Sequence, residues 1–174
     1  MPRFTFGRYA CLGIVVCLIL AVIGCFESKY PAGPKQPGKV ERRFVGNWII
    51  EQRDQDGQTN TSRLIVRNLH DEQYYIEWQT GDEAPFRATG WLNDMDGVLF
   101  ASLLPLTDDG QLAQKYTIIR VDWDGDKFEV RNLNDEFFKD KPFDSSDALR
   151  ALLGKHLNDE QMYKGEPLMA SREK

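Results

Sequence analysis

Residues 73–93, QYYIEWQTGDEAPFRATGWLN, contain two short runs of alternating side chains on either side of one polar turn. In the first run every second residue is a large apolar one, and these residues are Tyr74, Ile76 and Trp78. In the second run one face carries Phe86, Ala88, Gly90 and Leu92. A period of two residues is typical of a β-strand with one buried face. The stretch therefore predicts a hairpin with strands at about 73–80 and 85–93.

The same pattern continues over most of the chain after residue 44. Four Asp-Gly dipeptides, which favour tight hairpin turns, separate runs rich in β-branched and aromatic residues. Further strands are predicted at about 45–53, 62–69, 98–106, 115–123 and 127–133, with one more from Pro167 to Ser171. This spacing predicts a mainly β fold, an antiparallel meander of seven to nine strands that forms a barrel or a strongly curved sheet. The run at 98–106 is apolar on both faces, so we expect both faces to be covered.

One C-terminal amphipathic helix is predicted after the meander. Ser145 and Ser146 offer an N-cap, and Asp147 places a negative charge in the first helical turn. One stripe of the helix then carries Leu149, Leu152, Leu153 and Leu157. We expect this helix to lie against the sheet or to plug one end of a barrel.

The first 24 residues have the features of a signal for export. They contain no Asp or Glu, begin with Arg3 and Arg8, and continue in a 15-residue apolar run from Ala10 to Gly24. As a helix, this run would be about 22 Å long, short of the ~30 Å hydrocarbon core of a membrane. A cationic start, a short apolar run and a small-residue end are typical of a secretory signal helix.

The end of this run, Val22-Ile23-Gly24-Cys25, resembles the lipobox of bacterial lipoproteins. That resemblance implies cleavage between Gly24 and Cys25, a diacylglycerol on the Cys25 thiol, and a mature protein anchored by lipid on the extracytoplasmic side. Phe26 after the cysteine favours the outer membrane if the host has two membranes. The alternative is an uncleaved apolar helix, since the run through Phe26 has 17 residues and is just long enough to span a thinned bilayer.

The sequence divides the chain into a signal peptide at 1–24, a lipidated cysteine and flexible linker at 25–43, and a β-rich domain at 44–174. The linker is rich in Pro, Gly and Lys, and fully extended it would reach at most about 60 Å. Its basic residues suit either a solvated spacer or attraction to anionic headgroups. The whole chain has a formal net charge of −5, which argues against nucleic acid as a partner.

Gly46-Asn47-Trp48 on the first predicted strand, followed by a meander, a late helix and a short last strand, resembles the lipocalin-like layout over residues 44–172. The resemblance implies an eight-stranded barrel that holds an apolar ligand, with Gly46 and Trp48 at its closed end. The second motif of that family, Thr-Asp-Tyr, is not found in this sequence.

Aromatic residues are the candidates for a binding site. We expect them either to line a pocket or to form an ordinary core, and they are Tyr74, Trp78, Phe86, Phe100, Tyr116 and Phe128. Trp91 and Trp123 are the candidates for an exposed partner surface.

Motifs for catalysis or metal binding are weak. His70 and His156 lack matching carboxylate spacing, and the acidic turn at 122–126 lacks the distal Glu of a calcium loop. The sequence therefore predicts no enzyme, metal or cofactor, but non-enzymatic binding of a small apolar molecule or an envelope protein. The alternatives are a structural or assembly factor of the envelope and an uncleaved single-span protein of unknown function.

Overall fold

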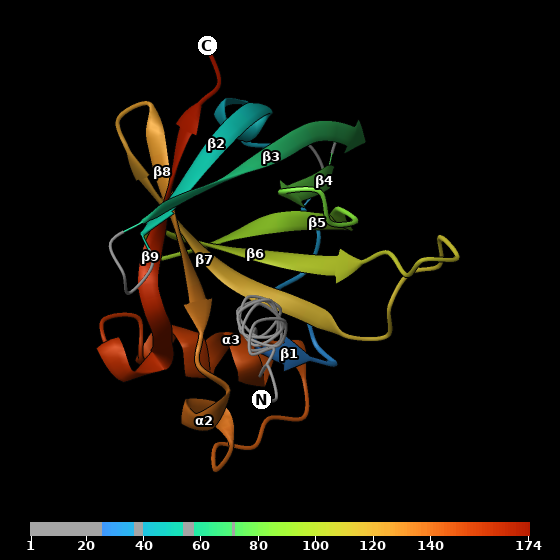
Figure 1. The fold of residues 1–174 in the computed structure, drawn as a ribbon. Helices are drawn as coiled ribbons and strands as arrows, with labels where there is room; N and C mark the ends of the chain where they lie inside the picture. Colours follow the sequence, from blue (N-terminus) through green and yellow to red (C-terminus); the bar gives the residue numbers. More distant parts are fainter. Residues whose placement is uncertain (1–25, 37–39, 54–57, 71) are drawn as a thin grey trace, which may run out of the picture.

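A computed structural model describes residues 26–36, 40–53, 58–70 and 72–174, which form a nine-stranded antiparallel sheet with short helices (Figure 1). The signal helix and the lipobox predicted within residues 1–25 lie outside the described residues. The strands are β1 (Glu27–Ser28), β2 (Gly46–Arg53), β3 (Thr59–His70), β4 (Gln73–Thr80), β5 (Phe86–Met95), β6 (Val98–Pro105), β7 (Tyr116–Asp124), β8 (Lys127–Leu133) and β9 (Tyr163–Arg172). The helices are η1 (Arg42–Phe44), α2 (Asp135–Phe138), α3 (Ser146–Lys155) and η2 (Glu160–Met162).

Eight of the strands close into a barrel. Each of β2 to β8 pairs with the next strand along the chain, and β9 then pairs with both β8 and β2. The ninth strand, β1, pairs with residues 116 and 117 of β7, just before the residues of β7 that pair with β8. The predictions of a mainly β fold and of a barrel are therefore confirmed, and β1 and the short helix α2 are additions that the sequence did not indicate.

The hairpin between β5 and β6 has the turn that its Asp-Gly sequence predicts. Asp96 has a φ of 55° and Gly97 a φ of 85°, so both central residues have the positive φ that a type I′ turn needs. The Asp94 carboxylate accepts a hydrogen bond of 2.9 Å from the backbone N–H of Gly97. Local turn chemistry therefore fixes the register of this hairpin.

Alternate residues of the strands fill the inside of the barrel. These buried side chains form one cluster, here called the inner core, which includes Trp48, Ile50, Val66, Tyr74, Val121 and Phe128. The alternation predicted for β4 is confirmed, because Tyr74 and Ile76 are buried in this cluster. The small residues Ala88 and Ala101 also belong to this cluster.

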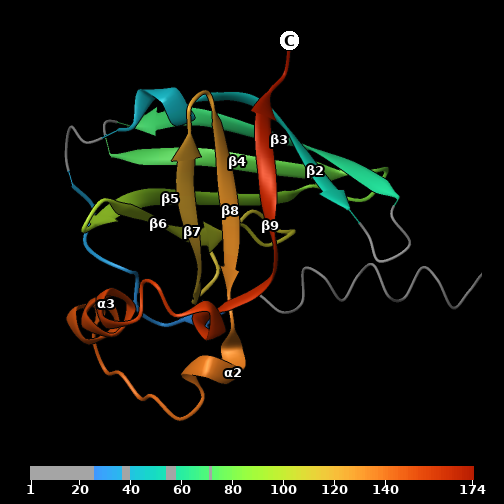
Figure 2. The same ribbon diagram turned by 90° about the vertical axis from the view of Figure 1, so that its left-hand side faces the viewer.

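A second cluster, here called the outer core, lies on the other side of β5, β6 and β7. It includes Phe26, Phe100, Ile118, Phe138, Leu149 and Leu153, so it is built from the barrel wall, α2, α3 and the first described residues. Figure 2 shows α3 and the blue segment at the beginning of the described chain on the same side of the barrel. Phe100 faces the outer core and Ala101 the inner core, which explains why β6 is apolar on both faces.

Residues 26–36, here called the N-terminal segment, differ from the flexible linker that their composition suggests. Phe26 is 5% and Ala32 0% exposed. The Ala32 backbone N–H donates to the Ser102 hydroxyl at 2.9 Å, and the Trp91 indole donates to the Gly33 carbonyl at 2.9 Å. The N-terminal segment is thus packed against the outside of the barrel.

Candidate functional site

One end of the barrel is filled by an aromatic group around Trp48. Its indole donates a hydrogen bond of 3.0 Å to the Phe44 carbonyl, and its ring lies 4.6 Å from that of Phe128. Helix η1 places the Phe44 ring in the same group, 5.1 Å from Phe128. Trp48 is fully buried in the inner core.

Two arginines cover this aromatic group. The Arg172 guanidinium lies 4.4 Å from the centre of the Trp48 ring and donates to the Arg43 carbonyl at 2.8 Å. The Arg43 guanidinium lies 4.3 Å from the Trp123 ring. A Cβ on Gly46 would lie 2.4 Å from Arg172 Nη1, so Gly46 leaves room for this arginine. The role of Arg172 depends on its pairing with Trp48 across β2 and β9, which local sequence patterns do not indicate.

The six aromatic residues predicted to line a pocket do not share one site. Tyr74 and Phe128 are buried in the inner core, and Trp78 and Phe86 pack against it while staying partly exposed. Phe100 belongs to the outer core. Tyr116 also lies on the outer side, where its ring is 5.6 Å from Trp91.

Tyr74 is positioned by a partly buried hydrogen bond. Its hydroxyl oxygen accepts from the Glu41 backbone N–H at 2.6 Å, which ties the chain before η1 to β4. Burial raises the pKa of Tyr74 to about 12, with a smaller raising effect from the charge of Glu41 and an opposing one from the backbone hydrogen bond. This tyrosine is therefore a neutral core residue at physiological pH.

Trp78 and Phe86 form the most accessible part of the inner aromatic set. They face each other across β4 and β5, and both are partly exposed. The Trp78 indole donates to the Ser62 hydroxyl at 2.8 Å.

The two tryptophans predicted to mark an exposed partner surface are not exposed. Trp91 is 5% exposed and lies beneath the N-terminal segment. Trp123 is partly buried and packs against the inner core beside Phe44 and Phe128. Strand alternation alone did not indicate that a distant segment would cover Trp91.

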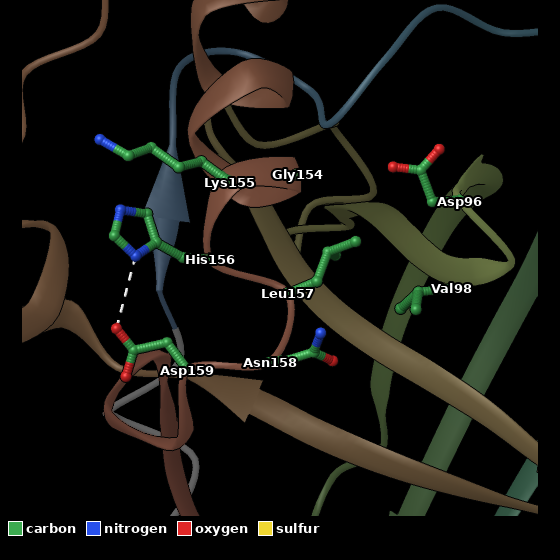
Figure 3. A pocket seen from close by; sticks show the side chains of 8 residues that line it. All are labelled: Asp96, Val98, Gly154, Lys155, His156, Leu157, Asn158 and Asp159. Atoms are coloured by element: carbon green, nitrogen blue, oxygen red, sulfur yellow. Dashed lines mark hydrogen bonds and ion pairs between the residues drawn. The ribbon is translucent and has the colours of Figure 1, made fainter.

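Two hollows lie outside the barrel, beside α3. The larger, with a volume of about 610 Å³, lies between the β5–β6 turn and the end of α3 (Figure 3), and its lining residues are Asp96, Val98, Gly154, Lys155, His156, Leu157, Asn158 and Asp159. The smaller, of about 360 Å³, lies further along α3, and Asp96 and Gly154 line both. The two hollows together are here called the groove. The sequence did not predict the groove, because the groove depends on how the tip of the β5–β6 hairpin packs near α3.

The side chains of this groove carry both charge signs. His156 Nδ1 lies 3.4 Å from an Asp159 carboxylate oxygen, the contact drawn in Figure 3. In the smaller hollow Arg150 donates to the Asp94 carbonyl at 2.6 Å. Within the described part of the chain, no group of three or more His, Cys, Asp or Glu side chains is placed to hold a metal ion. The groove suits polar contacts with a partner.

A second polar group holds the loop before β9 against the barrel wall. The Arg120 guanidinium donates to the Tyr163 hydroxyl at 2.7 Å and to the Leu157 carbonyl at 2.8 Å. The Arg131 guanidinium lies 4.2 Å from the Tyr163 ring and makes a two-fold hydrogen bond with Glu160. Burial raises the pKa of the Tyr163 hydroxyl, and the two nearby cations oppose this effect. These contacts hold the segment that follows α3 against β7 and β8.

No family model matches this chain, and no curated protein and no solved structure matches it. Among the described residues, no helix is both long enough and apolar enough to cross a membrane.

Proposed function

We propose that this protein is exported, is held at the membrane by a lipid on Cys25, and binds a protein partner of the cell envelope through the groove beside α3. Its activity is binding, with no chemical step. The outer membrane is the location that Phe26 favours if the host has two membranes.

The anchor is supported by the sequence Val22-Ile23-Gly24-Cys25. Phe26 is the first residue after that cysteine, and it is already buried in the outer core. A buried residue next to the predicted cleavage site is compatible with a mature protein that has Cys25 at its amino terminus.

The anchor is tested by expressing the full chain in a bacterium and measuring the intact mass of the membrane-bound product. We expect a chain that begins at Cys25 and carries a diacylglyceryl group, with or without a further acyl chain. The Cys25→Ser variant is expected to lose this added mass. A membrane-bound product that retains residues 1–24 would instead support an uncleaved span.

Binding through the outer surface is supported by one observation above others: the two hollows lie beside α3, outside the barrel, while large buried side chains fill the inner core. The hollows are open, have both polar and apolar lining residues, and combine a helix with a hairpin tip. Such a surface is better suited to a protein partner than to an apolar small molecule.

This binding site is tested by a photoreactive amino acid placed in the groove in living cells. Asn158 and Ala151 are exposed and line the two hollows, and Asp108, exposed in the loop after β6, provides the control position. We expect one discrete crosslinked species from positions 158 and 151 and none from position 108. Crosslinking from position 108 alone, or from none of the three, would contradict the proposal.

A small apolar ligand is the second candidate, because Trp78 and Phe86 leave part of an inner aromatic face accessible. Native mass spectrometry of the protein purified from exporting cells tests it. A bound mass of a few hundred daltons that is absent from Trp78→Ala would support this candidate. An unliganded mass after incubation with a lipid extract would rule it out.

A further inference from the structure

We infer that the lipid anchor holds the protein in one orientation, with α2 and the loop at 139–145 against the membrane surface. This inference rests on the proposed lipidation of Cys25. It goes beyond that proposal because it assigns a membrane-facing surface to the folded domain. The partner in contact with that surface is the lipid bilayer that carries the anchor.

The first step of the argument is the docking of Phe26. Its ring lies 4.2 Å from Phe138 of α2 and 6.1 Å from Phe143 of the following loop. Its carbonyl accepts a hydrogen bond of 3.3 Å from the Ile118 backbone N–H, on β7. The chain is therefore fixed to α2, to the loop and to the barrel wall at its first described residue.

The second step is that this docking continues along the chain. Residues 27 and 28 pair with β7 as β1, and Ser146 at the start of α3 donates from its hydroxyl to the Pro31 carbonyl at 2.7 Å. Gly33 lies so close to the barrel that a Cβ there would be 2.8 Å from Asn93 Nδ2. Releasing the N-terminal segment would break all of these contacts together.

The third step is the length of the remaining tether. A flexible linker from residue 25 to residue 43 would let the domain move up to about 60 Å from the membrane. With residues 26–36 docked, the anchor is one peptide unit from Phe26, and adjacent Cα atoms are about 3.8 Å apart. The acyl chains therefore leave the protein beside α2, and the bilayer surface lies next to this end of the molecule.

Charge does not supply the orientation. The surface formed by α2 and the following loop carries Lys139 and Lys141 against four acidic residues, Asp135, Glu136, Asp140 and Asp144. This excess of negative charge gives no net attraction to anionic headgroups. The covalent anchor and its short tether set the orientation, so the orientation is expected to be insensitive to salt.

The opposite end of the molecule provides the control. Figures 1 and 2 show α2 at one end and the chain's carboxyl terminus at the other. Asp126, in the turn between β7 and β8, is exposed, and β8 has seven residues that lead from this turn towards α2. At about 3.3 Å per residue, β8 separates the two regions by about 23 Å.

The test uses spin labels on the lipidated protein in vesicles of phosphatidylethanolamine and phosphatidylglycerol. Cys11 and Cys17 lie within residues 1–24, so a processed chain has no cysteine other than the lipidated Cys25. Labels are therefore attached singly through Asp140→Cys, near the predicted surface, and Asp126→Cys, at the other end. Lipids with nickel-chelating headgroups report how close each label lies to the bilayer.

We expect nickel lipids to increase the relaxation rate of the label at position 140 several-fold more than that of the label at position 126. An insertion of eight Gly and Ser residues between Cys25 and Phe26 should remove most of this difference, because it restores a long tether. The difference should persist in high salt. Thermal unfolding checks that each variant is folded.

The outcomes separate the two proposals. Equal relaxation at both positions in a protein of confirmed lipidated mass would overturn the orientation and leave the lipid anchor intact. A difference that survives the insertion would overturn the short tether as its cause. A processed mass without lipid would overturn the anchor itself and, with it, the inferred orientation.

Discussion

The two faces of β6 are both buried, but different parts of the chain cover them. On the inner face Ala101 and Leu103 meet side chains from the other strands of the barrel. On the outer face Phe100 and Ser102 meet the N-terminal segment and the helical elements after β8. The bond from Ala32 to Ser102 joins residues 70 positions apart, and the bond from Ser146 to Pro31 joins residues 115 apart.

The inner core is therefore built mainly by neighbouring hairpins. The outer core is built by segments far apart in the sequence, one before β2 and the others after β8. Apart from its closure by β9, the barrel pairs each strand with the next, so its contacts form over short distances in sequence. The outer core forms only when residues 26–34 and α3 meet on the barrel wall. We therefore expect the outer core to open locally at a lower free energy than the barrel.

The largest predicted effect follows from truncating the inner core. Trp48→Ala removes a fully buried side chain, its hydrogen bond to Phe44 and its contact with Phe128. Truncations of this kind cost about 3–5 kcal/mol of the free energy of unfolding. Urea unfolding followed by circular dichroism measures this loss. A change below about 1 kcal/mol would contradict the structural role of this residue.

A smaller effect is expected in the outer core. Leu153→Ala removes a fully buried side chain of α3 and should cost about 2–4 kcal/mol. Its distinctive result is spatial: hydrogen exchange should speed up in α3 and the N-terminal segment, while the amides of β3 and β4 keep their protection. Equal loss of protection in both regions would show that the two cores unfold as one unit.

The contact between the N-terminal segment and β6 can be weakened by removing one oxygen atom, the hydroxyl oxygen of Ser102. Ser102→Ala removes the hydroxyl that accepts from the Ala32 N–H, and leaves that buried donor without its partner. We expect a cost of about 1–2 kcal/mol and faster exchange at Ala32. The control is Thr61→Ala, at an exposed position on β3, which should change stability by less than about 0.5 kcal/mol.

Alkaline pH is a perturbation without a substitution, and it acts on Tyr74 of the inner core. Because burial raises the pKa of Tyr74 to about 12, its hydroxyl stays protonated in the folded state when it would ionise in the unfolded chain. This stabilising contribution is complete below pH 10 and is lost as the pH rises from about 10 to 12. Unfolding measured at several alkaline pH values should show this loss, and Tyr74→Phe should show less of it.

Much of the barrel was predictable because its patterns are local. Alternation in β4 and the Asp96-Gly97 turn identify strands and a hairpin without knowledge of their neighbours. The boundaries were less accurate: β3 spans Thr59–His70 and β9 spans Tyr163–Arg172, both longer than predicted. The extra residues of β3 are exposed, whereas β9 begins with Tyr163, which is buried in the outer core.

The candidate site was less predictable, because it depends on contacts between distant parts of the chain. Phe100 stands in a run that is apolar on both faces, so alternation gave no sign of which core it joins. Pro, Gly and Lys in residues 26–36 are typical of a linker, yet Ala32 and Gly33 are small because they pass close to β5 and β6. The groove beside α3 also depends on where the helix packs.

The most direct test of this account is hydrogen exchange of residues 26–34 in the processed, lipidated protein. We predict slow exchange at Ala32, whose N–H is bonded to Ser102, and protection of the short pairing between β1 and β7. Exchange at the rate of an unstructured peptide throughout this segment would contradict the account. The segment would then be a linker, the outer core would lack its first residues, and the anchor would leave the domain free to move.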